Sequence, residues 1–150
     1  MAAPDVAEYT VSTDRSRLDI DLIHRFLSEE SYWALRRERE QVERSIENSV
    51  CFGVFHGDEQ VGFARVVTDK ATFAWLADVF VVPEHRGRGL GKLLVEEVLG
   101  HPELAHVYRW VLGTADAHEL YRRFGFAELR ESSRFMARES VEEARRCAGN

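Results

Sequence analysis

The segment from residue 72 to residue 99 constrains the fold more strongly than any other part of the chain. Residues 72–82 are apolar at most positions, as in a central strand that is buried on both faces, and Pro83 ends this run. From residue 89 to residue 99 the apolar residues return at helical spacing, as in a helix with one buried face. The segment therefore predicts a buried strand joined to an amphipathic helix by a short loop.

The loop between this strand and this helix is rich in glycine and in basic residues. Three glycines at alternate positions let the main chain turn tightly and approach a ligand closely, because no Cβ intervenes. Amides at a helix start attract anions together with the helix dipole. Positive side chains add to this attraction at Arg86, Arg88 and Lys92. A diphosphate group is the anion that best fits such a loop.

Two common phosphate-binding motifs do not match this loop. A Walker loop needs Ser or Thr after its Gly-Lys pair, whereas Gly91-Lys92 is followed here by Leu93. A dinucleotide-binding fingerprint needs Gly-x-Gly-x-x-Gly after the first strand of a βαβ unit, whereas this chain has Gly-x-Gly-x-Gly far from its start. The diphosphate therefore belongs to a ligand of another class.

Composition and charge narrow the remaining choices. A net charge of -6 argues against nucleic acid as the main partner, while a basic spot on an acidic protein favours a small polyanionic ligand. No apolar stretch approaches the roughly 20 residues of a membrane-spanning helix, and the first residues lack the pattern of a secretory signal. We therefore expect a cytoplasmic protein that binds neither nucleic acid nor membrane. The scattered histidines and two distant cysteines predict no metal site and give no support to a disulfide.

The other segments alternate between strand and helix patterns. Helices are expected near residues 20–27, 37–47, 89–99 and 116–124, and strands near 6–12, 50–56, 61–67, 72–82, 107–112, 126–129 and 133–137. This order predicts one domain over residues 1–150, of the α+β class with an α/β/α layering. Its central sheet is expected to be mixed, mostly antiparallel, with about six to seven strands flanked by helices. The polar residues 139–150 are expected to form a peripheral tail.

Two motifs resemble the GNAT acetyltransferase superfamily. The coenzyme loop of that family reads Gln/Arg-x-x-Gly-x-Gly/Ala, and Arg86, Gly89 and Gly91 fill this pattern. Downstream, Ala117 to Phe126 is similar to the family pattern Ala-x-x-Leu-Tyr-x-x-x-Gly-Phe. The resemblance covers residues 50–137 well and the N-terminal helices by pattern only. It implies a GNAT-like fold, acetyl-CoA as cosubstrate, and transfer of the acetyl group to a primary amine on a small molecule or peptide.

The resemblance also implies roles for individual residues. Main-chain groups of Val81 and Val82 would contact the thioester and pantetheine. The pyrophosphate would be held by amides of the loop and helix start, namely those of Gly87, Arg88, Gly89, Leu90, Gly91 and Lys92. Tyr121 would donate a proton to the departing thiolate, which its ordinary pKa of about 10 permits, although its spacing alone also fits a core aromatic. Many relatives carry Asn where this chain has Thr114, so Thr114 or Asp116 would take over the pantetheine contact.

The acceptor side of the site rests on fewer residues. Asp78 lies inside an apolar strand, where an unpaired carboxylate is costly. It either holds or deprotonates the acceptor amine, or is a structural carboxylate bonded to Arg65 or to a backbone amide. Tyr32 and Trp33 resemble the segment that lines the acceptor pocket in the family, and packing explains them equally well.

The predicted chemistry is direct transfer from the thioester to the amine. No convincing Ser/His/Asp or Cys/His set is present, nothing around Cys51 suggests an activated thiol, and a backbone N–H near Val81 would stabilise the oxyanion. Two other functions stay open. One is a module of the same fold that senses acyl-CoA without turnover, and the other is an acidic interaction domain without a small ligand. A homodimer is expected from the family alone.

Overall fold

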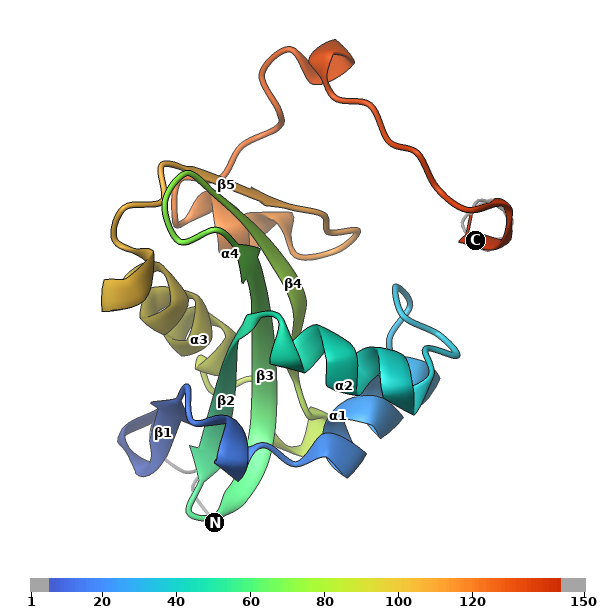
Figure 1. The fold of residues 1–150 in the computed structure, drawn as a ribbon. Helices are drawn as coiled ribbons and strands as arrows, with labels where there is room; N and C mark the ends of the chain where they lie inside the picture. The colour runs from blue at the N-terminus through green and yellow to red at the C-terminus, as the bar shows by residue number, and fades with distance from the viewer. Residues whose placement is uncertain (1–5, 144–150) are drawn as a thin grey trace.

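A five-stranded sheet in the order β1-β2-β3-β4-β5 forms the centre of the protein (Figure 1). The strands are β1 (Tyr9–Ser12), β2 (Val50–His56), β3 (Glu59–Thr68), β4 (Phe73–Val81) and β5 (Arg109–Leu112). Neighbouring strands are antiparallel from β1 to β4, and β5 runs parallel to β4. The structure is a computed structural model, and it describes residues 6–143. The mixed, mostly antiparallel sheet confirms the predicted fold class.

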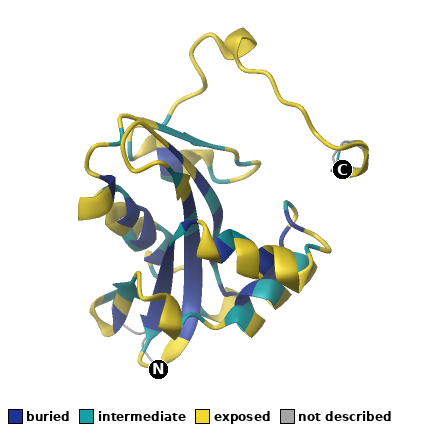
Figure 2. Ribbon diagram, in the orientation of Figure 1, coloured by how far each residue is buried: buried dark blue, intermediate teal, exposed yellow. Residues whose placement is uncertain are grey.

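Helices cover both faces of this sheet. They are α1 (Ile20–Arg25), which continues into a π-helical turn at Phe26–Glu30, α2 (Arg39–Glu47), α3 (Leu90–Leu99) and α4 (His118–Arg122). Figure 1 shows α3 on one side of the sheet, with α1 and α2 on the other. Because apolar surface is covered on both sides, β3 is buried from residue 60 to residue 64 and again at Val66, and the buried residues concentrate in the centre of the molecule (Figure 2). This is the α/β/α layering expected from the sequence.

The two longest helices follow the apolar periods of the sequence. Leu94 and Val98 are completely buried on the inner face of α3, and Val42 and Ile46 are the buried residues of α2. A reciprocal capping box, in which Glu38 and Gln41 bond each other's backbone amides, fixes the start of α2. Burial of one helical stripe, rather than of the whole helix surface, therefore holds each helix on the sheet.

The C-terminal part of the chain differs from the prediction. Neither residues 126–129 nor residues 133–137 form a strand; the second segment begins within a 3-10 turn at Ser132–Arg134. An amphipathic strand is stabilised by pairing and by a covered apolar face. Here, by contrast, the segment leads away from the sheet in Figure 1, and Met136 is 96% exposed. The sheet therefore has five strands rather than six to seven. Residues 139–142 are exposed, and the rest of the expected tail, from 144 onward, lies outside the described residues.

Strands β4 and β5 share only part of their length. Pairing runs from Phe73 opposite Arg109 to Leu76 opposite Leu112, and β4 continues to Val81 after β5 has ended. At the same place β4 contains a bulge, because two residues, Asp78 and Val79, lie opposite the single Ala64 of β3. Asp78 has a φ of 53°, in the left-handed region. The divergence of the two strands opens the sheet at its edge and positions the site described next.

Candidate active site between strands β4 and β5

The glycine-rich loop leads from β4 into α3 with two left-handed glycines. Gly87 has a φ of 77° and Gly89 a φ of 80°, values that side chains with a Cβ rarely adopt. Gly89 is also the N-cap residue of α3. The Arg86 guanidinium turns back and donates from Nε to the carbonyl oxygen of Val81 at 2.9 Å, which ties the loop to the end of β4. The loop is therefore folded by its own sequence into a tight turn at a helix N-terminus.

The amides of this turn are left without main-chain acceptors. Within the described part of the chain, Arg86 donates to the oxygen of Pro83, and the next backbone N–H to donate is that of Leu93, to the oxygen of Gly89. The amides in between belong to residues 87–92, the same six that the sequence predicted as a pyrophosphate cradle. Unpaired N–H groups at the start of a ten-residue helix form an anion site.

A cavity of about 540 Å³ lies against this loop. Its lining contains Val79 and Val81 from β4, Gly87, Gly89 and Gly91 from the loop, and Asp116, Leu120 and Tyr121 from the α4 region. Val82 is not part of the lining, and its N–H is bonded to the oxygen of Val61 at 2.9 Å. Arg88 and Lys92 also lie outside the lining; Arg88 donates to the hydroxyl of Tyr9 at 2.8 Å. The cavity thus gathers most, but not all, of the predicted coenzyme residues.

A second cavity, of about 570 Å³, adjoins the first and lies farther back along β4, against residues 75–79. Both cavities are lined by the same six residues at their junction: Tyr32, Trp33, Val79, Asp116, Ala117 and Tyr121. The second cavity adds Trp75, Asp78 and two arginines, Arg37 and Arg65. Two ligands, one in each cavity, would therefore meet beside Tyr121.

Tyr121 is held in this junction by packing. It is the buried residue of α4, with 7% of its surface exposed, and its ring lies edge-on to Phe126 at 5.8 Å between centroids. The pKa of Tyr121 is raised to about 12, mainly by burial and to a smaller extent by the nearby Tyr32 and Asp116. The phenol therefore keeps its proton at neutral pH and is a hydrogen-bond donor there.

Asp78 is the centre of a closed ion-pair network. Its Oδ2 accepts from Nε of Arg65 and from Nη1 of Arg37, each at 2.8 Å, while its Oδ1 accepts from Nε1 of Trp33 at 2.9 Å. The carboxylate side chain is only 2% exposed. The pairing with Arg65 is the one that the structural interpretation of Asp78 requires. The same carboxylate nevertheless lines the second cavity, so a role toward a ligand stays a prediction.

The remaining predicted residues lie in the loop after β5 and in the segment after α1. The hydroxyl of Tyr32 accepts a hydrogen bond from the amide of Ala115 at 2.8 Å, which links the two walls of the gap. The Thr114 hydroxyl accepts from the amide of Ala117 at 3.0 Å and so helps to start α4. Asp116 is exposed at the junction of the two cavities. Thr114 lines only the second of these cavities.

The structure adds residues that the sequence analysis did not assign to the site. His85 lines the first cavity, and its Nδ1 lies 2.8 Å from the hydroxyl of Tyr9. Arg37 and Trp75 line the second cavity. Arg65, which lies within an apolar strand, could have been found from that unusual position, and it entered the prediction only as a partner of Asp78. Arg37 lies in a charged segment, where its sequence neighbours give no signal of a buried contact.

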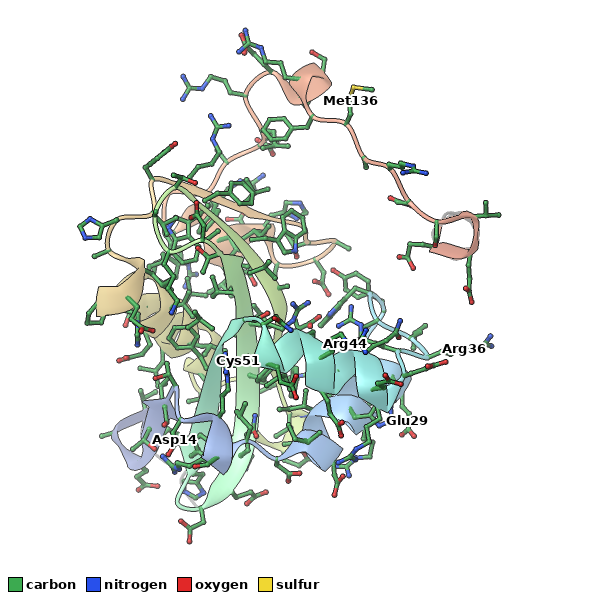
Figure 3. All side chains as sticks on the ribbon, in the orientation of Figure 1. Asp14, Glu29, Arg36, Arg44, Cys51 and Met136 are labelled. Atoms are coloured by element: carbon green, nitrogen blue, oxygen red, sulfur yellow. The ribbon has the colours of Figure 1, made fainter. Side chains whose placement is uncertain are left out.

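Cys51 does not take part in either cavity. It is a buried, unbridged cysteine on β2, between the sheet and α2 (Figure 3). Burial raises the pKa of its thiol to about 11, so the thiolate needed for an acyl-enzyme is scarce at neutral pH. Cys147 lies outside the described residues. Between residues 6 and 143, no set of three or more His, Cys, Asp or Glu side chains is arranged to hold a metal ion, and no helix has the length and apolar character to cross a membrane.

Known proteins share this architecture. The model of the acetyltransferase (GNAT) family matches residues 20–126. A protein of Gibberella zeae named "Putative acetyltransferase FG08082" is 32% identical over 83% of this chain and 82% of its own length. A Xanthomonas campestris pv. campestris crystal structure, described as a "putative acetyltransferase belonging to the GNAT family", is 48% identical, with a TM-score of 0.87 over 93% of this chain and 96% of that one. The structure of Rv2747 from Mycobacterium tuberculosis, determined in complex with CoA, shares the fold at 19% identity, with a TM-score of 0.66 over 93% of this chain and 81% of its own.

The fold and the two adjoining cavities fit the acetyltransferases as a class. Within that class, the match over most of the chain is to one family in particular. The chain belongs to the GNAT acetyltransferase family.

Proposed function

We propose that the protein is an N-acetyltransferase that moves the acetyl group of acetyl-CoA directly to a primary amine. The observation that carries this proposal is the meeting of two cavities at Tyr121, one of them lined by a loop of unpaired amides. A single ligand would need one cavity, whereas transfer between two substrates needs a separate approach for each. Binding of CoA by the structural neighbour Rv2747 supports the choice of coenzyme.

The residues of the first cavity fit a diphosphate-linked coenzyme. The amides of Gly87 and Gly89 would hold the pyrophosphate oxygens, and the exposed Arg86 and Lys92 would add positive charge at the entrance. Val81 contributes main-chain groups at the wall of the cavity, toward the thioester. Since the amide of Val82 is already bonded to Val61, the pantetheine contacts of β4 fall to Val81 and Val79.

The chemistry joins an amine nitrogen to the acetyl carbon. The neutral amine attacks the thioester carbonyl, the carbon–sulfur bond breaks, and the nitrogen gives up a proton as the amide forms. A backbone N–H near Val81 would stabilise the oxyanion. Direct attack suits the site better than an acyl-enzyme, because burial keeps the Cys51 thiol protonated and away from both cavities.

Tyr121 would complete the proton balance. Its hydroxyl donates a hydrogen bond to the sulfur as negative charge develops there. A phenol with a pKa of about 12 is a weaker acid than an ordinary thiol, whose pKa is about 8.5. Full proton donation by Tyr121 alone would therefore be unfavourable. We infer that Tyr121 passes on a proton that it regains from the attacking nitrogen, so that the phenol is neutral before and after the step.

The test combines coenzyme binding with turnover. Calorimetry with acetyl-CoA should show binding at sub-millimolar concentration, and release of the CoA thiol should depend on an added amine. Binding without amine-dependent thiol release would favour the alternative of a non-catalytic acyl-CoA sensor. Absence of binding would favour the alternative of an acidic interaction domain and would remove the proposal.

A pair of glycine variants tests whether the loop is the coenzyme site. Gly89→Glu places a negative side chain on the loop and should abolish acetyl-CoA binding by repulsion and obstruction. Gly57→Glu is the matched control, because Gly57 also has a positive φ and open space around it but lies in the turn between β2 and β3. Both variants place a side chain at a positive φ, which is 80° at Gly89 and 62° at Gly57. Equal acetyl-CoA affinity in the two would show that the coenzyme binds elsewhere.

A further inference from the structure

The second cavity contains charges of both signs, and their positions are not random. Its two basic residues, Arg37 and Arg65, line this cavity alone. Asp116, in contrast, lines both cavities and therefore lies at their junction, close to Tyr121. Glu143 contributes a further carboxylate to the lining. Away from the junction a ligand of the second cavity thus meets both arginines together with Asp78 and Glu143, and at the junction it meets Asp116.

The two arginines keep binding capacity beyond their bonds to Asp78. Asp78 occupies one N–H of each guanidinium group and leaves the other donors of both groups in place. Arg37 uses Nη1 for Asp78, and Arg65 uses Nε for Asp78 and Nη1 for the hydroxyl of Ser49. Each guanidinium has further N–H donors in its fork. Arg37 is the more accessible of the two, with 24% of its side chain exposed against 14% for Arg65.

Asp116 has the opposite character. Its carboxylate makes no hydrogen bond or ion pair with any residue between 6 and 143, and only its backbone N–H is engaged, weakly, with the hydroxyl of Thr114 at 3.4 Å. An unpaired, exposed carboxylate next to the reacting centre attracts an ammonium group. An acceptor that enters the second cavity would therefore turn its amine toward Asp116 and Tyr121.

We propose that the acceptor is a small zwitterion, a primary amine that also carries a carboxylate or another anionic group bound by Arg37. This inference rests on the proposed acetyl transfer and names the class of its acceptor. A polyamine would place a second cation beside the two guanidinium groups, and an uncharged amine would leave their remaining N–H donors without an anionic partner. A charge-assisted hydrogen bond from a guanidinium fork is strong and geometrically selective for planar anions. A cavity of about 570 Å³ is of a size typical for small ligands.

The experiment compares matched acceptors on the full-length protein with acetyl-CoA. Each α-amino acid in the panel is paired with its carboxamide and with the amine that lacks the carboxylate, and aminoethyl phosphate is paired with ethanolamine. Thiol release gives kcat and KM for every pair. The anionic member of a pair should have a kcat/KM about ten-fold or more above its partner. Comparison of the carboxylate pairs with the phosphate pair shows which anion the two arginines bind better.

A charge variant then links this preference to Arg37. In Arg37→Gln, KM for the anionic amines should rise about ten-fold or more, while the affinity for acetyl-CoA stays unchanged. Arg37→Lys should restore part of the loss, because it keeps the charge without the planar fork. Arg36→Gln is the matched control: Arg36 is the exposed neighbour that points into solvent in Figure 3, so its kinetics should equal those of the unaltered protein.

A binding measurement gives a readout that does not depend on turnover. Trp33 and Trp75 line the second cavity, so titration with N-acetylamino acids as product analogues should change tryptophan fluorescence. The change should saturate in the unaltered protein and weaken in Arg37→Gln. Circular dichroism and thermal unfolding verify that this variant is folded, which is expected because Asp78 keeps its bonds to Arg65 and Trp33.

The outcomes separate this inference from the proposed function. Faster acetylation of the uncharged members, equal effects of Arg37→Gln on both members of a pair, or acetyl-CoA binding without acetylation of any anionic amine would overturn the zwitterionic acceptor. The first two results would leave acetyl transfer intact. Failure to bind acetyl-CoA would instead remove the proposed function itself.

Discussion

Tyr121 lines both cavities, and burial decides what its hydroxyl can do. Removal from water disfavours the phenolate, which raises the pKa to about 12. Because the pKa in the folded protein exceeds the usual value of about 10, ionisation of Tyr121 lowers the stability of the fold only above about pH 10. At every physiological pH the neutral phenol, which is a hydrogen-bond donor, dominates. The residue is thus fixed as a donor, whatever its partner on the ligand.

Replacing Tyr121 by Phe should lower kcat by about 100-fold, because the hydrogen bond to the leaving sulfur is lost. Affinity for acetyl-CoA should change little, since the ring still packs edge-on to Phe126. Stopped-flow thiol release and calorimetry measure the two effects separately. Tyr108→Phe is the control, because that tyrosine is 77% exposed and lines neither cavity.

The pH profile of the unaltered protein checks the same assignment. With a pKa of about 12 at Tyr121, kcat should show no fall between about pH 8 and about pH 10 from loss of this proton. A kcat of Tyr121→Phe equal to that of the unaltered protein would eliminate the hydroxyl from the chemistry.

The role of a residue was predictable from the sequence where the residue belongs to a motif. It was not predictable where the role depends on tertiary contacts. The loop glycines and Tyr121 stand in local patterns, and the structure brings Gly87, Gly89 and Tyr121 to one cavity. The environment of Asp78 depends on Trp33 and Arg37, which are more than forty positions away in the chain. No periodicity or spacing in one sequence encodes such a contact.

At the level of elements, the bulge of β4 carries the carboxylate that links this strand to its neighbours. Asp78 accepts bonds from a loop, through Trp33 and Arg37, and from β3, through Arg65. Three donors from two segments therefore converge on one buried acid, and the strand deviates with a φ of 53° at that residue. The network joins the acceptor-side loop to the sheet.

Replacing Asp78 by Asn should lower the free energy of unfolding by about 3 kcal/mol, because two guanidinium groups lose their counter-charge in a buried place. Asn keeps the side-chain shape and tolerates the left-handed φ, so the loss reports on charge rather than on backbone strain. Urea unfolding monitored by circular dichroism measures it. Asp58→Asn, in the exposed turn between β2 and β3, should change stability by less than about 0.5 kcal/mol.

The same variant separates the two interpretations of Asp78. A structural carboxylate predicts a large loss of stability, with the remaining activity recoverable at low temperature. Unchanged stability together with a collapse of kcat would contradict the structural role and would identify Asp78 as a base.

Secondary structure was predictable where the apolar residues of a periodic pattern are buried. The prediction was wrong where these residues are exposed. The helix at residues 90–99 and the strands at 50–56 and 73–81 lie within about one residue of the expected ranges, because apolar residues there face the core. A strand was expected at residues 133–137, yet Phe135 is 43% exposed and the segment pairs with no strand of the sheet among the described residues. A local sequence pattern indicates a preference for extended structure. The segment becomes a strand only where it can pair with a neighbouring strand and bury one face.

At the scale of the whole molecule, two apolar regions are not covered by other described parts of the chain. Strand β5 pairs with β4 on one side and has no strand on its other side among the described residues, and a cavity of about 250 Å³ lies there, lined by Trp110, Leu112, Phe126 and Leu129. The C-terminal segment that leads away from the sheet exposes Phe135, Met136 and Val141 (Figures 1 and 3). Open strand edges and exposed apolar segments are stable in water when another chain covers them.

We therefore expect the protein to form a homodimer in which the C-terminal segment of each copy covers the β5 edge of the other. A two-fold arrangement buries both features at once, because each copy supplies one segment and one edge. Light scattering after size-exclusion chromatography should give the mass of a dimer, and Met136→Glu should shift it toward the monomer by placing a charge at a site that is 96% exposed in one chain. Ser132→Glu, which adds the same charge to the same segment without removing apolar surface, should stay dimeric. A protein that is monomeric at every concentration, or a Met136→Glu variant as dimeric as the control, would show that these residues face solvent.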